Sequence, residues 1–193
     1  MAMVSGVKSG FRRLEPRELM MWLYLATTAM LFMGFSSAYL VQRFTEGWMA
    51  VPLPAVTWIN TAFLLVSSYT YEWGRRGFLL GDYRRFQVGL MLTVVMGVLF
   101  LMGQVIGWQM LVRQGYFLAS NQKGVSYFYV LTFLHGLHLI AGLIVMGYWT
   151  VRAMLYKVRY EEGKRLRIAG LFWHALDALW VYLFVFLQLN QIF

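Results

Sequence analysis

The sequence predicts an all-α integral membrane bundle of five transmembrane helices, and three observations support this fold class. Of the 193 residues, 60% are hydrophobic and 13% are charged, about half the charged fraction of an average soluble domain. Five apolar runs, each long enough to cross a bilayer as a helix, are separated by charged segments. None of the runs shows the alternation of a membrane barrel strand, and only helices or closed barrels satisfy the backbone in lipid.

The apolar runs define the expected domain organisation. They cover about 19–42, 53–73, 88–112, 125–151 and 168–190. Proline is tolerated in the first turn of a helix, so the Glu15-Pro16 pair predicts where the first helix begins. We therefore expect an N-terminal segment at 1–18, followed by one five-helix transmembrane domain at 19–193.

The positions of lysine and arginine predict the orientation of the bundle. The N-terminal segment, the loop at 74–87 and the loop at 152–167 together hold 14 of the 17 basic residues, and the opposite side holds the other three, Arg43, Arg113 and Lys123. The positive-inside rule then places the N-terminus in the cytoplasm and the C-terminus on the periplasmic side. The net charge is +9. The basic residues that produce it are explained as signals for membrane topology and as contacts for lipid headgroups, so we expect no nucleic-acid partner.

The residue inventory argues against chemistry carried by this chain alone. There are no cysteines, which excludes thiolate metal sites, Fe–S clusters and covalent c-type haem attachment. The sequence has no phosphate-binding loop, no nucleophile paired with a base and no paired carboxylates. We therefore predict no catalytic residue, no metal site and no cofactor held by its own side chains.

Asp177 is the only acid well inside an apolar run. A carboxyl near the middle of a membrane costs at least about 2.5 kcal/mol on insertion scales, so it normally has a partner. His174, three residues earlier, shares its helix face. Trp173 and Trp180 flank the pair and are expected to pack against neighbours or lipid. A structural hydrogen bond is the favoured interpretation of the His174/Asp177 pair, and the alternatives are a proton-handling or metal role and a contact with lipid or a partner.

His135 and His138 lie on the fourth predicted helix. Two histidines on one helix do not make a zinc or haem site, so packing or hydrogen bonding is favoured over a partner contact or a metal role. With a rise of about 1.5 Å per residue, His138 and Asp177 lie at similar depths within the error of the helix boundaries. We therefore predict one structural polar cluster of His135 or His138 with His174 and Asp177, across the contact between the fourth and fifth helices.

Neutral polar and small residues complete the candidate list. Gln104 and Thr28 lie inside apolar runs, where such groups usually bond to the backbone or to a neighbouring helix for about 0.6 kcal/mol. We expect them to make packing, lipid or partner contacts. Gly103 and Gly107 are four residues apart, a spacing that lets helices approach closely.

Two stretches support a resemblance to a known family. They are Tyr127-Phe-Tyr-Val-Leu-Thr-Phe-Leu-His-Gly-Leu-His138 and Phe172-Trp-His-Ala-Leu-Asp-Ala-Leu-Trp180. In order and spacing they resemble the signature stretches of cytochrome c oxidase subunit III. Asn60-Thr61 and Ser67-Ser68 in the second run, and Leu31-Phe32 and Ser37-Ala38-Tyr39-Leu40 in the first, are also similar to that family. The resemblance covers about 20–189 and points to the five-helix short form, which lacks two helices of the longer members.

The resemblance implies a role in a haem-copper oxidase, which reduces O₂ with electrons from cytochrome c and pumps protons. It implies a non-catalytic subunit that stabilises subunit I, with haem and copper held by partner subunits. The other expected partners are subunit II, a subunit IV and phospholipids. The expected location is the inner (cytoplasmic) membrane of a bacterial cell.

Two positions depart from the family pattern. Thr28 stands where the family has a buried glutamate, and Gly107 stands where a glutamate follows the position of Gln104 by three residues. The first departure argues against proton uptake through the first helix. Variants with two threonines, as in Thr27-Thr28, resemble oxidases that associate with alternative complex III.

Two other functions stay open at this point. An accessory subunit of nitric oxide reductase has the same five-helix form. A stand-alone proton-coupled transporter would need more buried ionisable groups and repeat symmetry, which the sequence lacks.

Overall fold

The computed structural model describes residues 15–45, 48, 51–117 and 123–192. Within these ranges the chain is all-helical, as predicted, and has no strand. The elements are α1 (Pro16–Arg43), α2 (Val56–Leu79), α3 (Tyr83–Arg113), α4 (Lys123–Met154), the 3₁₀ turn η1 (Tyr160–Glu162) and α5 (Gly163–Ile192). Most of the expected N-terminal segment, residues 1–14, lies outside the described part.

Most of the helices are longer than the apolar runs that predicted them. The largest differences are at the charged ends: α2 ends at Leu79 instead of about residue 73, α3 begins at Tyr83 instead of about residue 88, and α5 begins at Gly163 instead of about residue 168. Hydropathy identifies only the part of a helix that suits lipid. A helix can continue into water, where its charged side chains are solvated and its backbone bonds remain within the helix.

Local sequence explains where two of the helices begin. Pro16 occupies the first turn of α1, where its missing N–H would have no intrahelical partner anyway. The side chain of Asp82 caps α3 by accepting a hydrogen bond from the Arg85 N–H at 3.0 Å. The turn between α2 and α3 is short because Gly81 adopts a φ of +80°, a conformation that costs glycine little.

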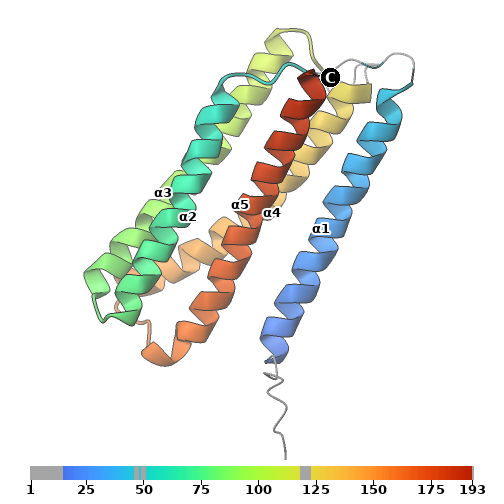
Figure 1. The fold of residues 1–193 in the computed structure, drawn as a ribbon. Helices are drawn as coiled ribbons and strands as arrows, with labels where there is room; N and C mark the ends of the chain where they lie inside the picture. Colours follow the sequence, from blue (N-terminus) through green and yellow to red (C-terminus); the bar gives the residue numbers. More distant parts are fainter. Residues whose placement is uncertain (1–14, 46–47, 49–50, 118–122, 193) are drawn as a thin grey trace, which may run out of the picture.

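The helices α2, α3, α4 and α5 form a four-helix core, and α1 lies beside α4 and α5 at its edge (Figure 1). In this core α2 packs against α3 and α5, α3 against α4, and α4 against α5. The helix α5 packs along α1, α2 and α4, and Trp180 also reaches α3, where its ring lies 4.8 Å from that of Phe100. The candidate site lies where α5 meets α2.

The most extensive contact joins α2 and α3, an antiparallel pair. Here Gly74 and Gly89 face each other so closely that a Cβ atom added at Gly89 would lie 2.5 Å from Gly74 Cα. Further along, a Cβ atom at Gly103 would collide with the side chain of Asn60. Small residues thus allow close approach of these two helices, as the spacing of Gly103 predicted.

Polar contacts tie both ends of α1 to α5. At one end Arg167 pairs with Glu18 at 2.9 Å, and Lys164 pairs with Glu15. The hydrogen bond from Lys164 holds the pKa of Glu15 below its usual value. At the other end Arg43 donates a hydrogen bond to Asn190 Oδ1 at 3.0 Å. The two helices therefore run in the same direction.

Within the described residues, four helical segments are long and apolar enough to cross a membrane: α1, α3, α4 and the segment Tyr160–Gln191. The helix α2 has 24 residues, but its buried face is rich in polar side chains, among them Asn60, Thr61 and Ser67. These polar groups lower the hydropathy of α2, and several of them belong to the site described next.

Candidate functional site: a hydroxyl seam between α2 and α5

His174 and Asp177 share one partner, Ser68 of α2. Ser68 Oγ lies 2.8 Å from His174 Nδ1 and donates a hydrogen bond to Asp177 Oδ2. Asp177 is 4% exposed, and its second oxygen, Oδ1, has no hydrogen-bond partner among the described residues. The buried acid is therefore bonded to α2, whereas the sequence predicted a partner on the fourth helix.

The two tryptophans of α5 also bond to hydroxyls of α2. Trp173 Nε1–H donates to Ser67 Oγ, and Trp180 Nε1–H donates to Thr61 Oγ1, each at 3.1 Å. Both indole rings are buried, at 0% and 1% exposed. We call this set the hydroxyl seam: Thr61, Ser67 and Ser68 of α2 with Trp173, His174, Asp177 and Trp180 of α5.

Helical spacing explains why the seam forms. Trp173, Asp177 and Trp180 follow each other at steps of four and three residues, so they lie on one face of α5. Thr61 and Ser68 are seven residues apart, two turns of α2, and Ser67 is adjacent. Indole N–H groups are donors only and usually need an acceptor when buried, and the hydroxyls of Ser67 and Thr61 supply one each.

The histidines of α4 lie elsewhere. The His135 ring is fully buried between Phe100 of α3 and Trp180, at centroid distances of 5.9 and 5.0 Å. Neither of its ring nitrogens has a partner among the described residues. His138 Nδ1 bonds to the Leu134 carbonyl at 2.8 Å, and its ring packs beside Phe32 of α1 at 5.8 Å.

The predicted cluster of His135 or His138 with His174 and Asp177 is therefore corrected. His174 and Asp177 bond to Ser68 on α2, His135 contacts aromatic rings of α3 and α5, and His138 faces α1. The physical reason is rotational: residues three apart differ by about 60° around a helix axis. In a bundle where α4 has α1, α3 and α5 as neighbours, that angle directs His135 and His138 to different helices.

Gln104 and Thr28 are both buried, at 6% and 8% exposed. Gln104 lies at an apolar recess of about 220 Å³ between α3 and α4, with Trp108 and Gly136 among its walls. Thr28 lies on α1 one turn from Tyr24 and from Phe32, the two residues whose rings approach His138.

A cavity of about 230 Å³ opens beside the seam, at the end where α1 and α5 begin. His174 and Tyr71 form part of its wall, and their rings meet edge to face at 5.6 Å. The other polar residues of the wall come from three helices: Glu18 and Trp22 of α1, Glu72 and Arg75 of α2, and Arg167 of α5. The seam is thus connected to the charged end of the bundle.

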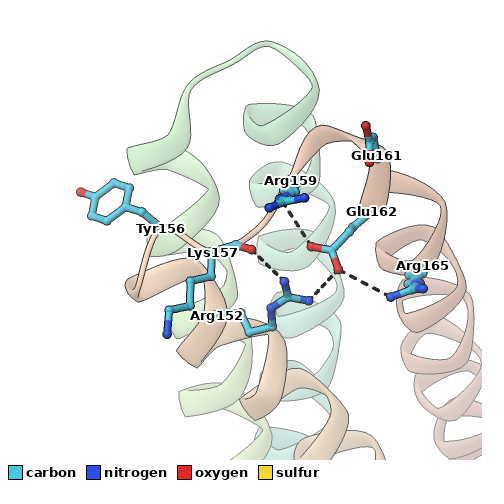
Figure 2. A pocket seen from close by; sticks show the side chains of 7 residues that line it. All are labelled: Arg152, Tyr156, Lys157, Arg159, Glu161, Glu162 and Arg165. Carbon is cyan, nitrogen blue, oxygen red and sulfur yellow. Dashed lines mark hydrogen bonds and ion pairs between the residues drawn. The ribbon is translucent and has the colours of Figure 1, made fainter.

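A second cavity, of about 790 Å³, lies at the loop between α4 and α5 and is lined by seven residues, of which four are basic (Figure 2). Arg152 and Arg165 converge there on Glu162, at 2.6 and 3.6 Å. Arg152 also donates to the Lys157 carbonyl at 2.8 Å. These contacts fold the loop onto the ends of its two helices.

Ser67, Ser68 and Thr61 are site residues that the sequence did not predict. They entered only as points of family resemblance, because serine and threonine are common in membrane helices and usually bond to the backbone. The sequence feature that could have identified them is the number of hydroxyl side chains in the second apolar run, combined with the two tryptophans and the acid of the fifth run, which need polar partners. Among the described residues, no group of three or more His, Cys, Asp or Glu side chains is arranged to hold a metal ion.

The Thr61–Trp180 bond gives a first prediction. We expect Thr61→Val to lower the free energy of unfolding by about 0.6 kcal/mol, the average for a hydrogen bond between membrane helices. Unfolding in mixed micelles at increasing SDS, followed by circular dichroism, measures this loss. A double-mutant cycle with Trp180→Phe should return a coupling energy of the same size, and a coupling of zero would contradict the bond.

These features define a class: a multi-pass membrane bundle whose buried polar groups mostly bond to neighbouring helices. The chain belongs to the cytochrome c oxidase subunit III family, whose sequence model matches residues 16–190. Members of this family are subunits of haem-copper oxidases, the membrane-bound oxidoreductases of respiratory chains.

Individual relatives agree with this assignment. The chain is 33% identical over 181 residues to the cytochrome c oxidase subunit 3 of Thermostichus vulcanus, covering 90% of this chain and 87% of the relative. It is 29% identical over 167 residues to a probable cytochrome c oxidase subunit 3 of Nocardia farcinica, covering 84% and 82%. It is also 31% identical over 173 residues to the cytochrome bo(3) ubiquinol oxidase subunit 3 of Pseudomonas aeruginosa, covering 87% and 82%.

Proposed function

We propose that this protein is the non-catalytic subunit III of a bacterial cytochrome c oxidase in the inner membrane, where it stabilises subunit I and binds phospholipid. The observation that carries the proposal is the family match over residues 16–190. The haem and copper that reduce O₂ belong to the partner subunits. The hydroxyl seam supports a structural role, because Trp173 and Trp180 use their polar groups within the chain.

All five helices cross the membrane in this proposal, including α2. The support for α2 is its place in the bundle: it packs along α3 and α5, which are both long and apolar enough to span. Several of its polar side chains, such as Thr61, Ser67 and Ser68, bond within the bundle and need no water. The exposed side chains of α2 include Trp58, Ile59 and Leu65, which suit contact with lipid.

The proposed orientation has the N-terminus in the cytoplasm and the C-terminus in the periplasm. Its support is the distribution of basic residues over the ends of the bundle. The described part of the end where α1 and α5 begin carries Arg17, Arg75, Arg76, Arg84, Arg85, Arg152, Lys157, Arg159, Lys164, Arg165 and Arg167, whereas the described part of the other end carries Arg43, Arg113 and Lys123. The positive-inside rule assigns the first end to the cytoplasm.

Purification in a mild detergent tests the assembly. A tagged chain expressed in its own host should copurify with subunits I and II, and with haem absorbance in the same chromatographic peak. A colourless peak containing only this chain would contradict the proposal. From the Thr27-Thr28 pair we also propose an association with alternative complex III, and its absence from the purified complex would remove only that association.

The same preparation distinguishes the related activities. We expect it to oxidise reduced cytochrome c with consumption of O₂. Oxidation of ubiquinol instead would assign the chain to an oxidase like that of the Pseudomonas aeruginosa relative. Reduction of nitric oxide without consumption of O₂ would overturn the oxidase function.

A further inference from the structure

The environment of Asp177 does not suit a carboxylate ion. The side chain is 4% exposed and lies in the membrane part of α5, and its hydrogen-bond partner in the described part of the chain is the neutral Ser68. No lysine or arginine pairs with it among the described residues, whose ion pairs all involve glutamates. An unpaired charge in such a place is costly, and the group normally becomes neutral instead. We therefore expect the Asp177 carboxyl group to be protonated.

Ser68 connects Asp177 to a base. Its Oγ is within hydrogen-bond distance of both Asp177 Oδ2 and His174 Nδ1. A hydroxyl can donate one hydrogen bond while it accepts another. The three side chains thus form a continuous path along which a proton can shift without movement of the backbone.

His174 connects the path to the charged end of the bundle. Its half-buried ring lines the 230 Å³ cavity between α1, α2 and α5. The charged groups around that cavity are paired: Glu72 with Arg75 at 2.7 Å, and Glu18 with Arg167 at 2.9 Å. These pairs bring polar groups up to the imidazole and leave no net charge facing it.

We propose that Asp177 is a proton-binding site that exchanges with one side of the membrane through Ser68 and His174. When Asp177 is protonated, the carboxyl donates to Ser68 Oγ and the Ser68 hydroxyl turns to donate to His174 Nδ1. In the outward step, Asp177 gives its carboxyl proton to Ser68 Oγ while the Ser68 hydroxyl proton passes to His174 Nδ1. The imidazolium then releases its Nε2 proton to water in the cavity. The products are the Asp177 carboxylate, neutral His174 and one hydronium ion, and uptake is the same sequence reversed.

The path ends at Asp177. The next polar contact along the seam is the bond from Trp180 Nε1–H to Thr61. An indole N–H is a donor only and accepts no proton, so this contact does not extend the relay. Asp177 therefore stores a proton from the end of the bundle where α5 begins, and does not pass it to the opposite side.

The chain offers a clean spectroscopic test, because Asp82 and Asp177 are its only aspartates. The full chain is produced with aspartate that carries ¹³C at the side-chain carboxyl, and infrared spectra are recorded at neutral pH. We expect an isotope-shifted C=O band of a protonated carboxyl. It should disappear in Asp177→Asn and persist in Asp82→Asn, since Asp82 is an exposed helix cap.

Transfer into D₂O then tests the relay. We expect the band of the unmodified chain to shift rapidly, and the exchange to slow by about 100-fold or more in Ser68→Ala and in His174→Phe, since a positioned proton carrier typically contributes that much to a rate. Thr61→Val and His138→Phe are the matched controls, because they alter a hydroxyl of α2 and a histidine of α4 outside the relay. Both should exchange at the original rate.

Three results would overturn the proposal: no protonated aspartate band at neutral pH, no exchange in the unmodified chain, or equal exchange rates in Ser68→Ala and Thr61→Val. Circular dichroism of every variant identifies loss of fold, and Ser68→Ala is the smaller change if His174→Phe does not fold. The measurement uses the chain alone, so its outcome is independent of the proposed oxidase assembly.

Discussion

Replacing Trp173 with alanine is expected to lower the free energy of unfolding by about 3–5 kcal/mol, the usual cost of removing a large buried aromatic side chain. Trp173 is 0% exposed and fills space that glycines leave open on two other helices. A Cβ atom added at Gly97 of α3 would lie 2.9 Å from its ring, and one at Gly142 of α4 would lie 3.3 Å away. Its N–H bonds to Ser67 of α2, so one side chain holds α5 to three helices.

Unfolding by SDS in mixed micelles, followed by circular dichroism, measures this loss. Trp173→Phe should fall between the alanine variant and the original chain, because it keeps most of the ring volume but loses the donor. Trp22→Ala is the control on α1, where the indole is 51% exposed, and it should cost well under half as much. Equal losses at Trp173 and Trp22 would show that Trp173 is not the centre of the packing.

Gly89→Val is expected to destabilise the protein by about 3 kcal/mol or more, at the upper end for overpacking. A Cβ atom at residue 89 would lie 2.5 Å from Gly74 Cα and 2.9 Å from the Thr70 carbonyl oxygen. These are backbone atoms of α2, so no side chain can rotate away to relieve the contact. The helices α2 and α3 would have to separate, which would also disturb the Thr70–Thr93 hydrogen bond of 3.0 Å.

Gly147→Val is the matched control for this substitution. Gly147 lies on α4, and a Cβ atom added there meets nothing within 4 Å. The same unfolding measurement should show a change within about 0.5 kcal/mol for Gly147→Val, as for most open surface positions. If the two valine variants are equally stable, the close approach of Gly74 and Gly89 does not determine the packing of α2 and α3.

The helices themselves were predictable, because hydropathy is a local property. The runs at 88–112, 125–151 and 168–190 lie inside α3, α4 and α5. The second run was harder to interpret: α2 is a helix, but it is less apolar than the four segments that meet the length and hydropathy of a membrane span. Some of its hydroxyls face α5 in the seam and not lipid. A hydropathy scale does not distinguish these two environments, so the hydroxyls lower the hydropathy of α2 in either case.

The candidate residues were predictable in part. Asp177 and His174 stand out in sequence because an acid inside an apolar run needs a partner. Their partner, Ser68, lies 106 residues before His174, and a serine carries no comparable signal. The rotation of α4 about its axis decides which helices His135 and His138 face. That rotation depends on how the side chains of four helices pack, and no single apolar run determines it.

The amino-acid sequence alone determined that this chain is helical and membrane-embedded, with one buried acid whose helix face also carries a histidine and two tryptophans. These features follow from composition and from 3.6-residue periodicity, which each segment carries by itself. Only the tertiary structure decided that α2 bonds to this face, and that a cavity reaches His174 from the charged end. Those facts depend on contacts between residues about a hundred positions apart, which arise only when the helices pack.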